Sequence, residues 1–220
     1  MRADIRPFSL PLADPLETAR GTIERRDGLL LRLEAEEGAV GVGEAAPLPG
    51  WTEHYDECES VLASASDAID GGEEPDDLLA GLDSTPAARH ALDLALADLR
   101  ASRQRVPLYR YLGSENPAKS VPVNATVGDA PADETVEEAE KAANAGFDCL
   151  KVKVGARQLS ADVARIEAVA DALPEVELRA DANAAWTRQQ AQQFLDAVGD
   201  LLAYVEQPLP ATDVAGLASL

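Results

Sequence analysis

Several residue types that would define a class of protein are scarce in this chain. Its 220 residues include two cysteines, and aromatic residues make up 4%. Cys58 and Cys149 form no Cys-x-x-Cys pair, so we expect two reduced, partly buried thiols rather than a zinc site or disulfide framework. No run of about 18 apolar residues occurs, and the opening MRADIRPFSLPLADPLE lacks the apolar centre of a secretory leader. These absences predict a cytoplasmic protein that does not span a membrane.

Positive charge is also scarce. The chain has 19 Lys and Arg residues against 40 Asp and Glu residues, which gives a formal net charge of −21. Nucleic acid and anionic membranes bind basic surfaces, so neither is an expected partner. The lysines are Lys119, Lys141, Lys151 and Lys153. A strongly acidic surface with little lysine is typical of salt-adapted proteins, in which salt screens self-repulsion; an ordinary acidic cytosolic protein is the alternative.

The first part of the chain has the pattern of an α+β domain, which we place at residues 1–115. The stretch GLLLRLEAEEGAVGVGEAAPLPG alternates and is interrupted by glycine, which predicts a β-meander with a turn at Glu36–Gly38. The pattern is helical from about Thr52 to Leu112. In TPAARHALDLALADLRAS one apolar stripe follows a candidate N-cap, Ser84 or Thr85, with proline in the first turn.

Strands and helices alternate after a predicted linker near residues 114–120. Strands are predicted for VPVNATV, FDCLKVKVG, VELRADAN and LLAYVEQPLP, and helices for the three stretches between them. This alternation is the signature of parallel βαβ units, and the predicted strand ends recur about every 25–28 residues, the length of one unit. Those ends lie near Thr126, Lys153, Asp181 and Glu206.

Two of the four lysines lie together in the second of these strands. Lys151 and Lys153 are two residues apart and therefore share one face of the strand, whereas Leu150, Val152 and Val154 share the other. If the strand lies at a sheet edge, the lysine pair is simply a solvated face. If the strand is part of a barrel, both ammonium groups lie near the end where catalytic groups collect.

Acids and an amide end the next two predicted strands. Asp181 and Asn183 end the third strand and Glu206 ends the fourth. Two carboxylates on adjacent parallel strands can converge on Mg²⁺, which prefers oxygen ligands. The simpler interpretations are that Asp181 caps the helix near Thr187 and that Glu206 is a loop acid. Charged groups at three evenly spaced strand ends favour one shared site.

Together these motifs resemble the enolase superfamily, in its muconate-lactonising-enzyme-like branch. The residues that carry the resemblance are KVK at 151–153, DANAAW at 181–186 and VEQPLP at 205–210, together with GVGEAAPLPGW at 41–51 and VPLYRYLG at 106–113. The resemblance covers nearly the whole chain. It implies an α+β capping domain at 1–115 (a β-meander plus helices) followed by the first half of a (β/α) barrel domain at 116–220.

The resemblance also implies a chemistry and a role for each residue. Asp181 and Glu206 would be ligands of a Mg²⁺ cofactor that binds the carboxylate of a small-molecule substrate. Lys153 would be the base that removes the proton α to that carboxylate, in its neutral form, with Lys151 as its charged catalytic partner. Asn183 would orient groups near the lysines and contact the substrate.

Within this branch the chain is most like the o-succinylbenzoate synthases. The segment PLPGWTEHYDECES and the stretch that begins FSLPLADPLE carry this likeness, which implies dehydration of a cyclohexadiene carboxylate in menaquinone synthesis. Dipeptide epimerases, N-acylamino acid racemases and muconate cycloisomerases are the alternatives. Substrate contacts are expected from Leu12–Arg20 and Pro49–His54, with Arg20 and Trp51 as the candidate residues. Packing between domains is the other interpretation of Trp51, and a homo-oligomer is compatible with the sequence.

About half of the expected barrel precedes Leu220. The resemblance implies about eight strands, of which the chain supplies about four. The family's third metal-binding acid and second lysine belong to later strands, and a half barrel would expose two parallel edges. A hypothesis of a different class is therefore a truncated, non-catalytic fragment that needs a partner half.

Overall fold

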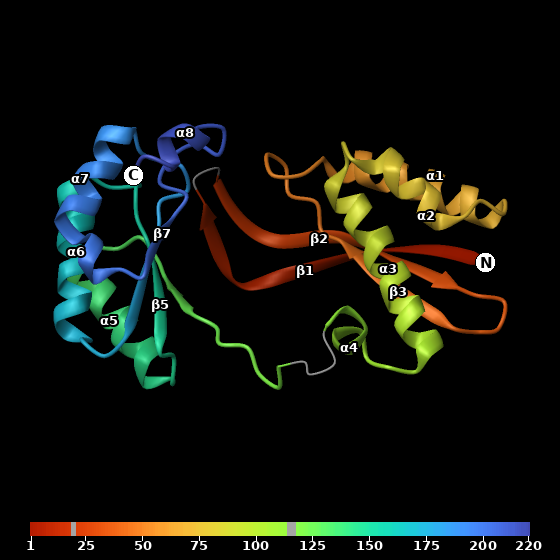
Figure 1. The fold of residues 1–220 in the computed structure, drawn as a ribbon, viewed down its shortest axis with the longest axis horizontal. Helices are drawn as coiled ribbons and strands as arrows, with labels where there is room; N and C mark the ends of the chain where they lie inside the picture. Colours follow the sequence, from red (N-terminus) through yellow and green to blue (C-terminus); the bar gives the residue numbers. More distant parts are fainter. Residues whose placement is uncertain (19–20, 114–117) are drawn as a thin grey trace. The chain divides into compact units, whose positions relative to one another are not determined.

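The chain forms two compact units, Met1–Lys119 and Ser120–Leu220 (Figure 1). The structure is a computed structural model that describes residues 1–18, 21–113 and 118–220. Most of the expected linker, residues 114–117, lies outside the described residues, as does Arg20. No helix among the described residues has the length and apolar character needed to cross a membrane.

An antiparallel sheet forms the first unit. Its strands β1 (Arg2–Thr18), β2 (Gly21–Glu34) and β3 (Val40–Ala45) pair in sequence order, as the alternating pattern predicts. Between β2 and β3 the amide of Gly38 donates to the carbonyl of Ala35 at 2.9 Å, and Gly38 has a φ of +87°. Glycine adopts that conformation without steric cost, so the turn predicted at Glu36–Gly38 is confirmed.

Helices cover this sheet, and the longest lies very close to it. They are α1 (Tyr55–Asp70), α2 (Pro75–Leu78), a 3₁₀ turn η1 (Leu79–Leu82), α3 (Pro86–Gln104) and α4 (Leu108–Leu112). A Cβ atom added at Gly41 or Gly43 of β3 would collide with backbone atoms of α3. Small residues on both elements allow this approach, so alanine and leucine fill a core with few aromatic residues.

The start of α3 differs from the prediction. Thr85 occupies the N-cap position, but its side chain accepts no hydrogen bond from the helix and donates to the carbonyl of Leu82 instead. The buried carboxylate of Glu53 accepts from the amides of Ala87 and Ala88, at 3.1 and 2.8 Å. The unpaired amides of the first turn are thus satisfied by a residue more than thirty positions earlier in the sequence.

A parallel sheet forms the second unit, with β4 (Ala125–Val127), β5 (Cys149–Lys153), β6 (Glu177–Asp181) and β7 (Tyr204–Glu206) paired in sequence order. The helices are α5 (Ala132–Asn144), α6 (Leu159–Ala172), α7 (Arg188–Val198) and α8 (Val214–Leu217), with a 3₁₀ turn η2 (Gly199–Leu201). The strand predicted over 121–127 begins only at Ala125, because Val121 and Val123 are solvent-exposed and outside the sheet.

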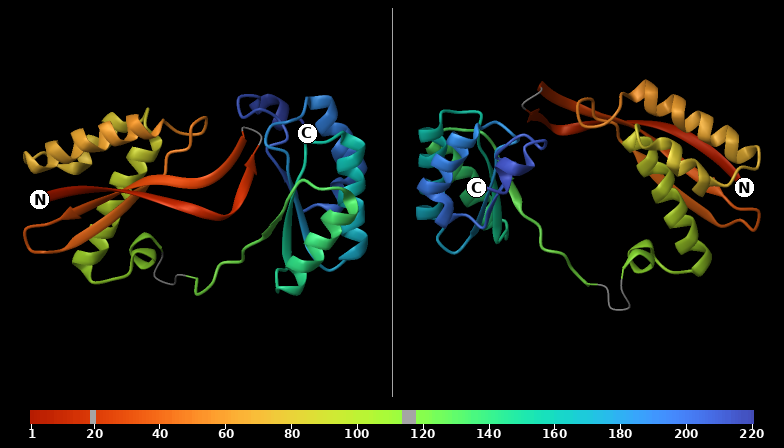
Figure 2. Two further views of the ribbon diagram at one scale, coloured as in Figure 1. Left: turned by 180° about the vertical axis from the view of Figure 1, so that it is seen from behind. Right: turned by 45° about the horizontal axis from the view of Figure 1, so that its top comes forward.

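The two faces of this sheet have opposite character. Helices α5, α6 and α7 lie along one face (Figures 1 and 2), and the buried side chains of Leu150, Val152 and Leu178 belong to the core there. Lys151 and Lys153 alternate with Leu150 and Val152 along β5 and therefore lie on the opposite face, as predicted. The described parallel strands present their charged groups on one side of the sheet.

Candidate active site at the ends of the parallel strands

The strand register brings three charged residues into one row. Lys153 pairs with Asp181 across β5 and β6, and Asp181 pairs with Glu206 across β6 and β7. Residues in register on parallel strands direct their side chains to the same face. The even spacing noted in the sequence is thus a physical alignment at the C-terminal ends of neighbouring strands.

The side chains in this row make direct contacts with one another. Lys153 Nζ lies 2.6 Å from Asp181 Oδ2 and 2.9 Å from Asn183 Oδ1. Lys151 Nζ lies 3.2 Å from Asp181 Oδ2 and 3.2 Å from Glu206 Oε2. The oxygens of the two carboxylates therefore converge on one cationic group. The candidate site residues named from the sequence on these three strands are within one connected cluster: Lys151, Lys153, Asp181, Asn183 and Glu206.

Burial and charge act in opposite directions on these groups. Burial alone would raise the pKa of Asp181. Hydrogen bonds from Lys153, from the backbone amide of Asn183 and from Lys151 hold that pKa below its usual value. For Lys151, burial would lower the pKa, whereas hydrogen bonds to Asp181 and Glu206 raise it. Asp181 is thus a stable carboxylate, and Lys151 is a stable ammonium group.

The simpler interpretations of these residues are wrong. The helix α7 begins with a capping box formed by Thr187 and Gln190, whereas Asp181 Oδ1 accepts from the amide of Asn183 at 3.0 Å. Strand β5 is an inner strand between β4 and β6, and the Lys151 side chain is only 20% exposed. Glu206 is the last residue of β7 and contacts Lys151. Each charged side chain therefore has a partner within the cluster.

The loops that follow β6 and β7 hold each other in place. Asn183, Ala184 and Gln207 all have positive φ values, of 46°, 63° and 43°. The amide of Ala184 donates to the carbonyl of Gln207 at 2.7 Å, and the amide of Ala182 donates to the carbonyl of Glu206 at 3.1 Å. Left-handed non-glycine residues cost free energy and persist where surrounding contacts impose them, often at functional sites. The Asn183 side chain is placed by this strained turn.

A divalent cation suits the two carboxylates. Among the described residues there is no group of three or more His, Cys, Asp or Glu side chains placed to hold a metal. Mg²⁺ is commonly bound by one or two carboxylates and completes its shell with water and substrate oxygens. Asp181 and Glu206 already direct oxygens at one cation, the Lys151 ammonium group, so their chemistry fits a shared Mg²⁺.

The remaining predicted contacts belong to the first unit. Trp51 lies in the loop between β3 and α1 and is 58% exposed. Arg20, at the end of the stretch Leu12–Arg20, lies outside the described residues. The roles of Trp51 and Arg20 in substrate binding remain predictions.

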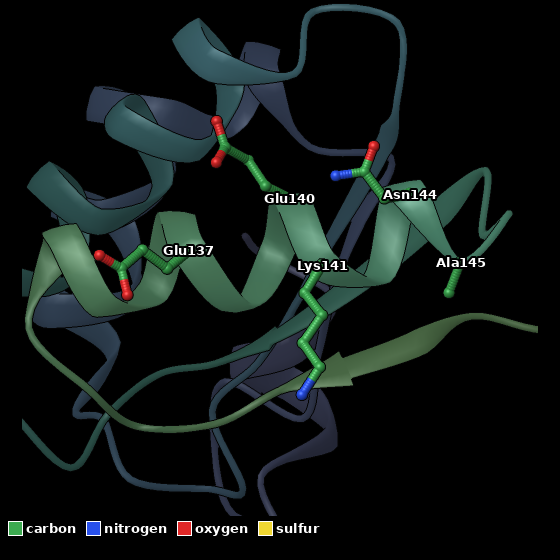
Figure 3. A pocket seen from close by; sticks show the side chains of 5 residues that line it. All are labelled: Glu137, Glu140, Lys141, Asn144 and Ala145. Carbon is green, nitrogen blue, oxygen red and sulfur yellow. The ribbon is translucent and has the colours of Figure 1, made fainter.

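A depression elsewhere on the second unit is separate from this cluster. It has a volume of about 590 Å³ and is lined by Glu137, Glu140, Lys141, Asn144 and Ala145. These residues all come from α5 and its C-terminal cap (Figure 3). None of the strand-end residues lines it, so it adds nothing to the candidate site.

Sequence reasoning missed a buried ion pair behind the strand ends. Asp162 and Arg165 of α6 are fully buried, with Arg165 Nη1 3.0 Å from Asp162 Oδ1. A signal was present, because both charges lie on the same helical stripe as Ile166 and Val169, which pack into the core. A charged pair on the core-facing stripe of a helix indicates a buried polar network.

Two family models cover most of the chain. The model described as "Mandelate racemase / muconate lactonizing enzyme, N-terminal domain" matches residues 2–113, and that described as "Enolase C-terminal domain-like" matches residues 134–220. A hydrophobic dipeptide epimerase from Enterococcus faecalis is 32% identical over 97% of this chain and 62% of its own length. An o-succinylbenzoate synthase from Thermosynechococcus vestitus is 34% identical over 100% of this chain and 65% of its own length.

Solved structures of similar proteins include the same two kinds of relative, a dipeptide epimerase and an o-succinylbenzoate synthase. The dipeptide epimerase from Enterococcus faecalis V583, complexed with Mg and L-Leu-L-Tyr, has a TM-score of 0.88 at 32% identity and matches 98% of this chain and 63% of its own. The o-succinylbenzoate synthase from Thermosynechococcus elongatus BP-1, complexed with Mg, has a TM-score of 0.75 at 30% identity and matches 100% and 65%. The chain thus spans less than two thirds of the length of these relatives.

Proposed function

Because this chain belongs to the enolase superfamily, we propose that it carries the lysine pair and two metal-binding carboxylates of an active site that removes a proton α to a carboxylate. The observation that carries this proposal is the row Lys153, Asp181 and Glu206, in register on three strands. Lys153 lies at the end of that row, within hydrogen-bond distance of Asn183. The substrate would be a small molecule with a carboxylate group.

Each residue has a part in the proposed reaction. Lys153 Nζ would accept the α-proton, and Lys151 would stay protonated and stabilise negative charge on the substrate. Mg²⁺ is the cofactor of enolase-superfamily enzymes, and the two relatives above were solved with Mg. Asp181 and Glu206 would hold it, and it would supply positive charge to the substrate carboxylate as the proton leaves. Asn183 would orient the Lys153 amine.

The half-reaction can be tested without knowing the final product. The chain is incubated in deuterated water with Mg²⁺ and a candidate substrate, and α-proton exchange is followed by NMR. We expect exchange in the unmodified chain and in the exposed control Asp196→Asn, and no exchange in Lys153→Ala. Exchange that persists in Lys153→Ala would exclude Lys153 as the base.

Metal binding gives a second, independent test. Mg²⁺ affinity is measured by calorimetry for the chain and for the variants Asp181→Asn and Glu206→Gln. Because each variant replaces a charged ligand with an amide of the same shape, we expect both to weaken binding strongly. Affinity unchanged in both variants would place the metal elsewhere.

For the completed reaction, the first candidate is o-succinylbenzoate synthesis, a hydro-lyase step in menaquinone formation. The segment PLPGWTEHYDECES and the 34% identity to the Thermosynechococcus vestitus enzyme favour it. The second candidate is dipeptide epimerisation, which the higher TM-score of the Enterococcus faecalis structure favours. Loss of the cyclohexadiene absorbance indicates the first reaction, and deuterium incorporation with inversion in a dipeptide indicates the second.

The acidic composition supports function at high salt. At a net charge of −21 the folded chain repels itself, and ions screen that repulsion. We expect the melting temperature to rise steadily as KCl is raised to molar concentrations. A melting temperature that does not change with KCl would favour an ordinary acidic protein.

A further inference from the structure

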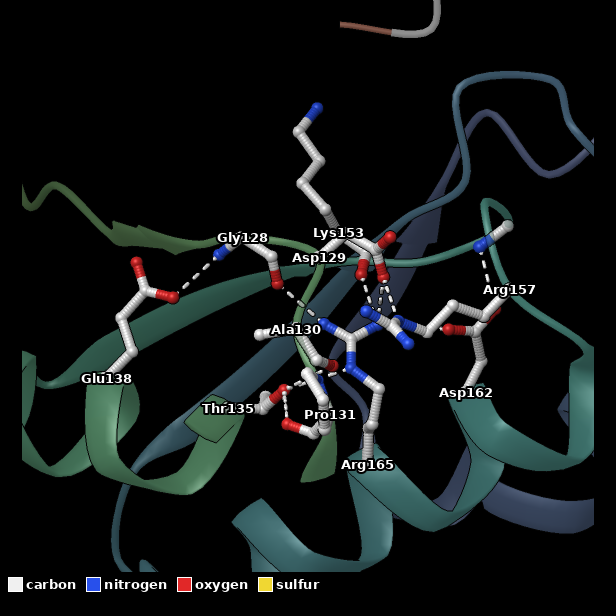
Figure 4. A network of polar contacts seen from close by, with 11 residues as sticks. Gly128, Asp129, Ala130, Pro131, Thr135, Glu138, Lys153, Arg157, Asp162 and Arg165 are labelled. Carbon is white, nitrogen blue, oxygen red and sulfur yellow. Dashed lines mark hydrogen bonds and ion pairs between the residues drawn. The ribbon is translucent and has the colours of Figure 1, made fainter. Parts of the chain in front are cut away.

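Arg165 is a buried arginine whose contacts surround the end of the lysine-bearing strand. Its side chain is 1% exposed and extends from α6 toward the ends of β4 and β5 (Figure 4). The guanidinium group donates to Thr135 Oγ1 at 3.0 Å, to the Gly128 carbonyl at 2.6 Å and to the Lys153 carbonyl at 2.8 Å. One side chain thus joins two helices to the ends of two strands.

The network around Arg165 is balanced in charge. Arg165 Nη1 also lies 3.0 Å from Asp162 Oδ1 and 3.6 Å from Asp129 Oδ1, and Asp129 Oδ1 lies 2.6 Å from Arg157 Nε. Two cations thus face two carboxylates. No buried side-chain nitrogen or oxygen among the described residues lacks a hydrogen-bond partner. A buried network with every group satisfied holds its members in one arrangement.

The position of these contacts along the strands is informative. Pairing between β4 and β5 ends at Val127 and Val152, so the carbonyls of Gly128 and Lys153 lie one residue beyond the ladder. Arg165 donates to both carbonyls. The guanidinium group therefore continues the connection between the two strands past the point where backbone pairing stops.

The backbone is also fixed just after Lys153. The amide of Gly155 donates to Asp162 Oδ2 at 2.8 Å. Gly155 has a φ of +91°, and a Cβ atom there would lie 2.6 Å from Cβ of Ala185. Asp162 and Arg165 therefore hold the backbone at the Lys153 carbonyl and at Gly155, directly after the residue whose side chain reaches Asp181 and Asn183.

We propose that Arg165, held by Asp162, is a positioning residue that sets the backbone at Lys153 and so directs Lys153 Nζ toward the substrate site. This rests on the proposed function, in which Lys153 is the base. Figure 4 shows the Lys153 side chain extending away from the network while its carbonyl faces Arg165. The contacts of Arg165 in the described residues end on α5, α6 and the ends of β4 and β5, whereas Asp181 and Glu206 lie on β6 and β7.

The test must separate positioning from support of the fold. Replacing a buried ion pair by apolar residues of similar size is often neutral or stabilising, so the variant is Asp162→Leu/Arg165→Met. Arg188→Met, at the exposed start of α7, is the matched control. Because the chain has four lysines, ¹³C labelling at lysine Cε gives four NMR signals, which single Lys→Arg variants assign.

We expect the double variant to remain folded by circular dichroism while the Lys153 signal moves toward that of exposed Lys141. The Lys151 signal and the Mg²⁺ affinity should change little. In the α-proton exchange assay kcat should fall about 10- to 100-fold with KM nearly unchanged, since a misplacement of about 1 Å can cost about 100-fold in rate. The Arg188→Met control should match the unmodified chain.

Two results would overturn this proposal. One is a folded double variant whose Lys153 signal stays where it is; the other is an equal shift of all four lysine signals, which indicates a general structural role. If the double variant does not fold, Thr135→Val is judged by the same criterion, because it keeps the side-chain volume and removes the acceptor of Arg165 Nε. If the unmodified chain shows neither Mg²⁺ binding nor α-proton exchange, the proposed function is wrong, but the positioning of Lys153 is still tested. The Lys153 NMR signal can be measured without Mg²⁺ binding or exchange.

Discussion

The two faces of the parallel sheet divide stability and chemistry between them. The face against α5, α6 and α7 is apolar, and Leu150, Val152 and Ala180 are 0% exposed there. The opposite face carries Lys151 and Lys153 on the same strand, one position out of phase. Because side chains alternate along a strand, five consecutive residues of β5 serve both purposes.

This division between the two faces predicts which property a substitution on each face should change. Apolar contacts hold the strands against the helices, and their removal costs folding free energy. On the other face the lysines and Glu206 are partly exposed and share their ion pairs, so removing one of them should cost less stability than removing a core side chain, but it alters the site. Substitutions on the two faces should therefore separate into effects on unfolding and effects on chemistry.

The largest expected effect is on the apolar face. Leu150→Ala removes a fully buried side chain and should lower the free energy of unfolding by about 2–5 kcal/mol. Lys153→Met, three residues later, should cost less, because Asp181 keeps its contacts with Lys151 and with the Asn183 backbone amide. Urea unfolding is followed by Trp186 fluorescence in a Trp51→Phe background, because Trp186 is the tryptophan of the second unit. Equal losses in the two variants would contradict the division between faces.

The next effect concerns two glycines with nearly the same backbone conformation. Gly38 has a φ of +87° with open space around its Cβ position, and Gly155 has a φ of +91° with Cβ of Ala185 2.6 Å away. An alanine in the left-handed region costs about 1–2 kcal/mol at either position. Gly155→Ala should cost about 1–3 kcal/mol more, because the neighbouring backbone must also shift.

Each glycine variant is measured in its own unit. Trp186 fluorescence reports Gly155→Ala, and protection of the buried Cys58 thiol in a Cys149→Ser background reports Gly38→Ala. A cost at Gly155 no larger than that at Gly38 would show that the turn after β5 is free to move. The inference that the end of β5 is rigidly connected to the helix that follows it would then be wrong.

Local patterns in the sequence were sufficient for most elements and for the strand-end residues. Alternation predicted the β-meander, and the βα rhythm placed Lys153, Asp181 and Glu206 at successive strand ends, where the structure has them. These features depend on residues close in sequence. The direction of each side chain follows from the period of a strand, so Lys151 and Lys153 could be assigned to one face.

Features that depend on distant residues could not be predicted in the same way. Residues 121–124 alternate like a strand but gain no partner, so propensity alone was misleading there. The cap of α3 comes from Glu53 and not from Thr85, because a buried carboxylate from a distant loop satisfies the amides. The contacts of Arg165 with Gly128 and Lys153 join segments far apart in sequence.

A smaller effect should appear in acid on the polar face. The lysine hydrogen bonds hold the pKa of Asp181 below its usual value, so its stabilising contribution is present above about pH 4 and is lost as pH falls through the folded-state pKa. Asp181→Asn removes this contribution, so the variant's stability should fall less steeply between about pH 5 and pH 3. The urea midpoint of unfolding at each pH measures this pH dependence of stability, with exposed Asp196→Asn as the control. If the urea midpoints of Asp181→Asn and of the unmodified chain fall in parallel as pH falls, this prediction is wrong.

The smallest expected effect is a difference in reactivity between the two thiols, one in the closed core and one on the polar face. Burial, with a hydrogen bond to Glu53, raises the pKa of Cys58 to about 12. Burial and a hydrogen bond to Glu177 also raise the pKa of Cys149, but Cys149 lies half-buried on the polar face beside the lysines. Thiolate is the reactive form, so a disulfide reagent at pH 8 should modify Cys149 first and Cys58 only on unfolding.

The same thiols give an alkaline limit to stability. Because the folded-state pKa of Cys58 lies above the unfolded value, its protonated form is favoured by folding, and stability should fall as pH rises from about 9 toward about 12. Cys58→Ala should reduce that slope, and Cys149→Ser should change it less. If the two thiols react at the same rate at pH 8, the polar face is as closed as the core. The sheet would then present no open surface for a substrate.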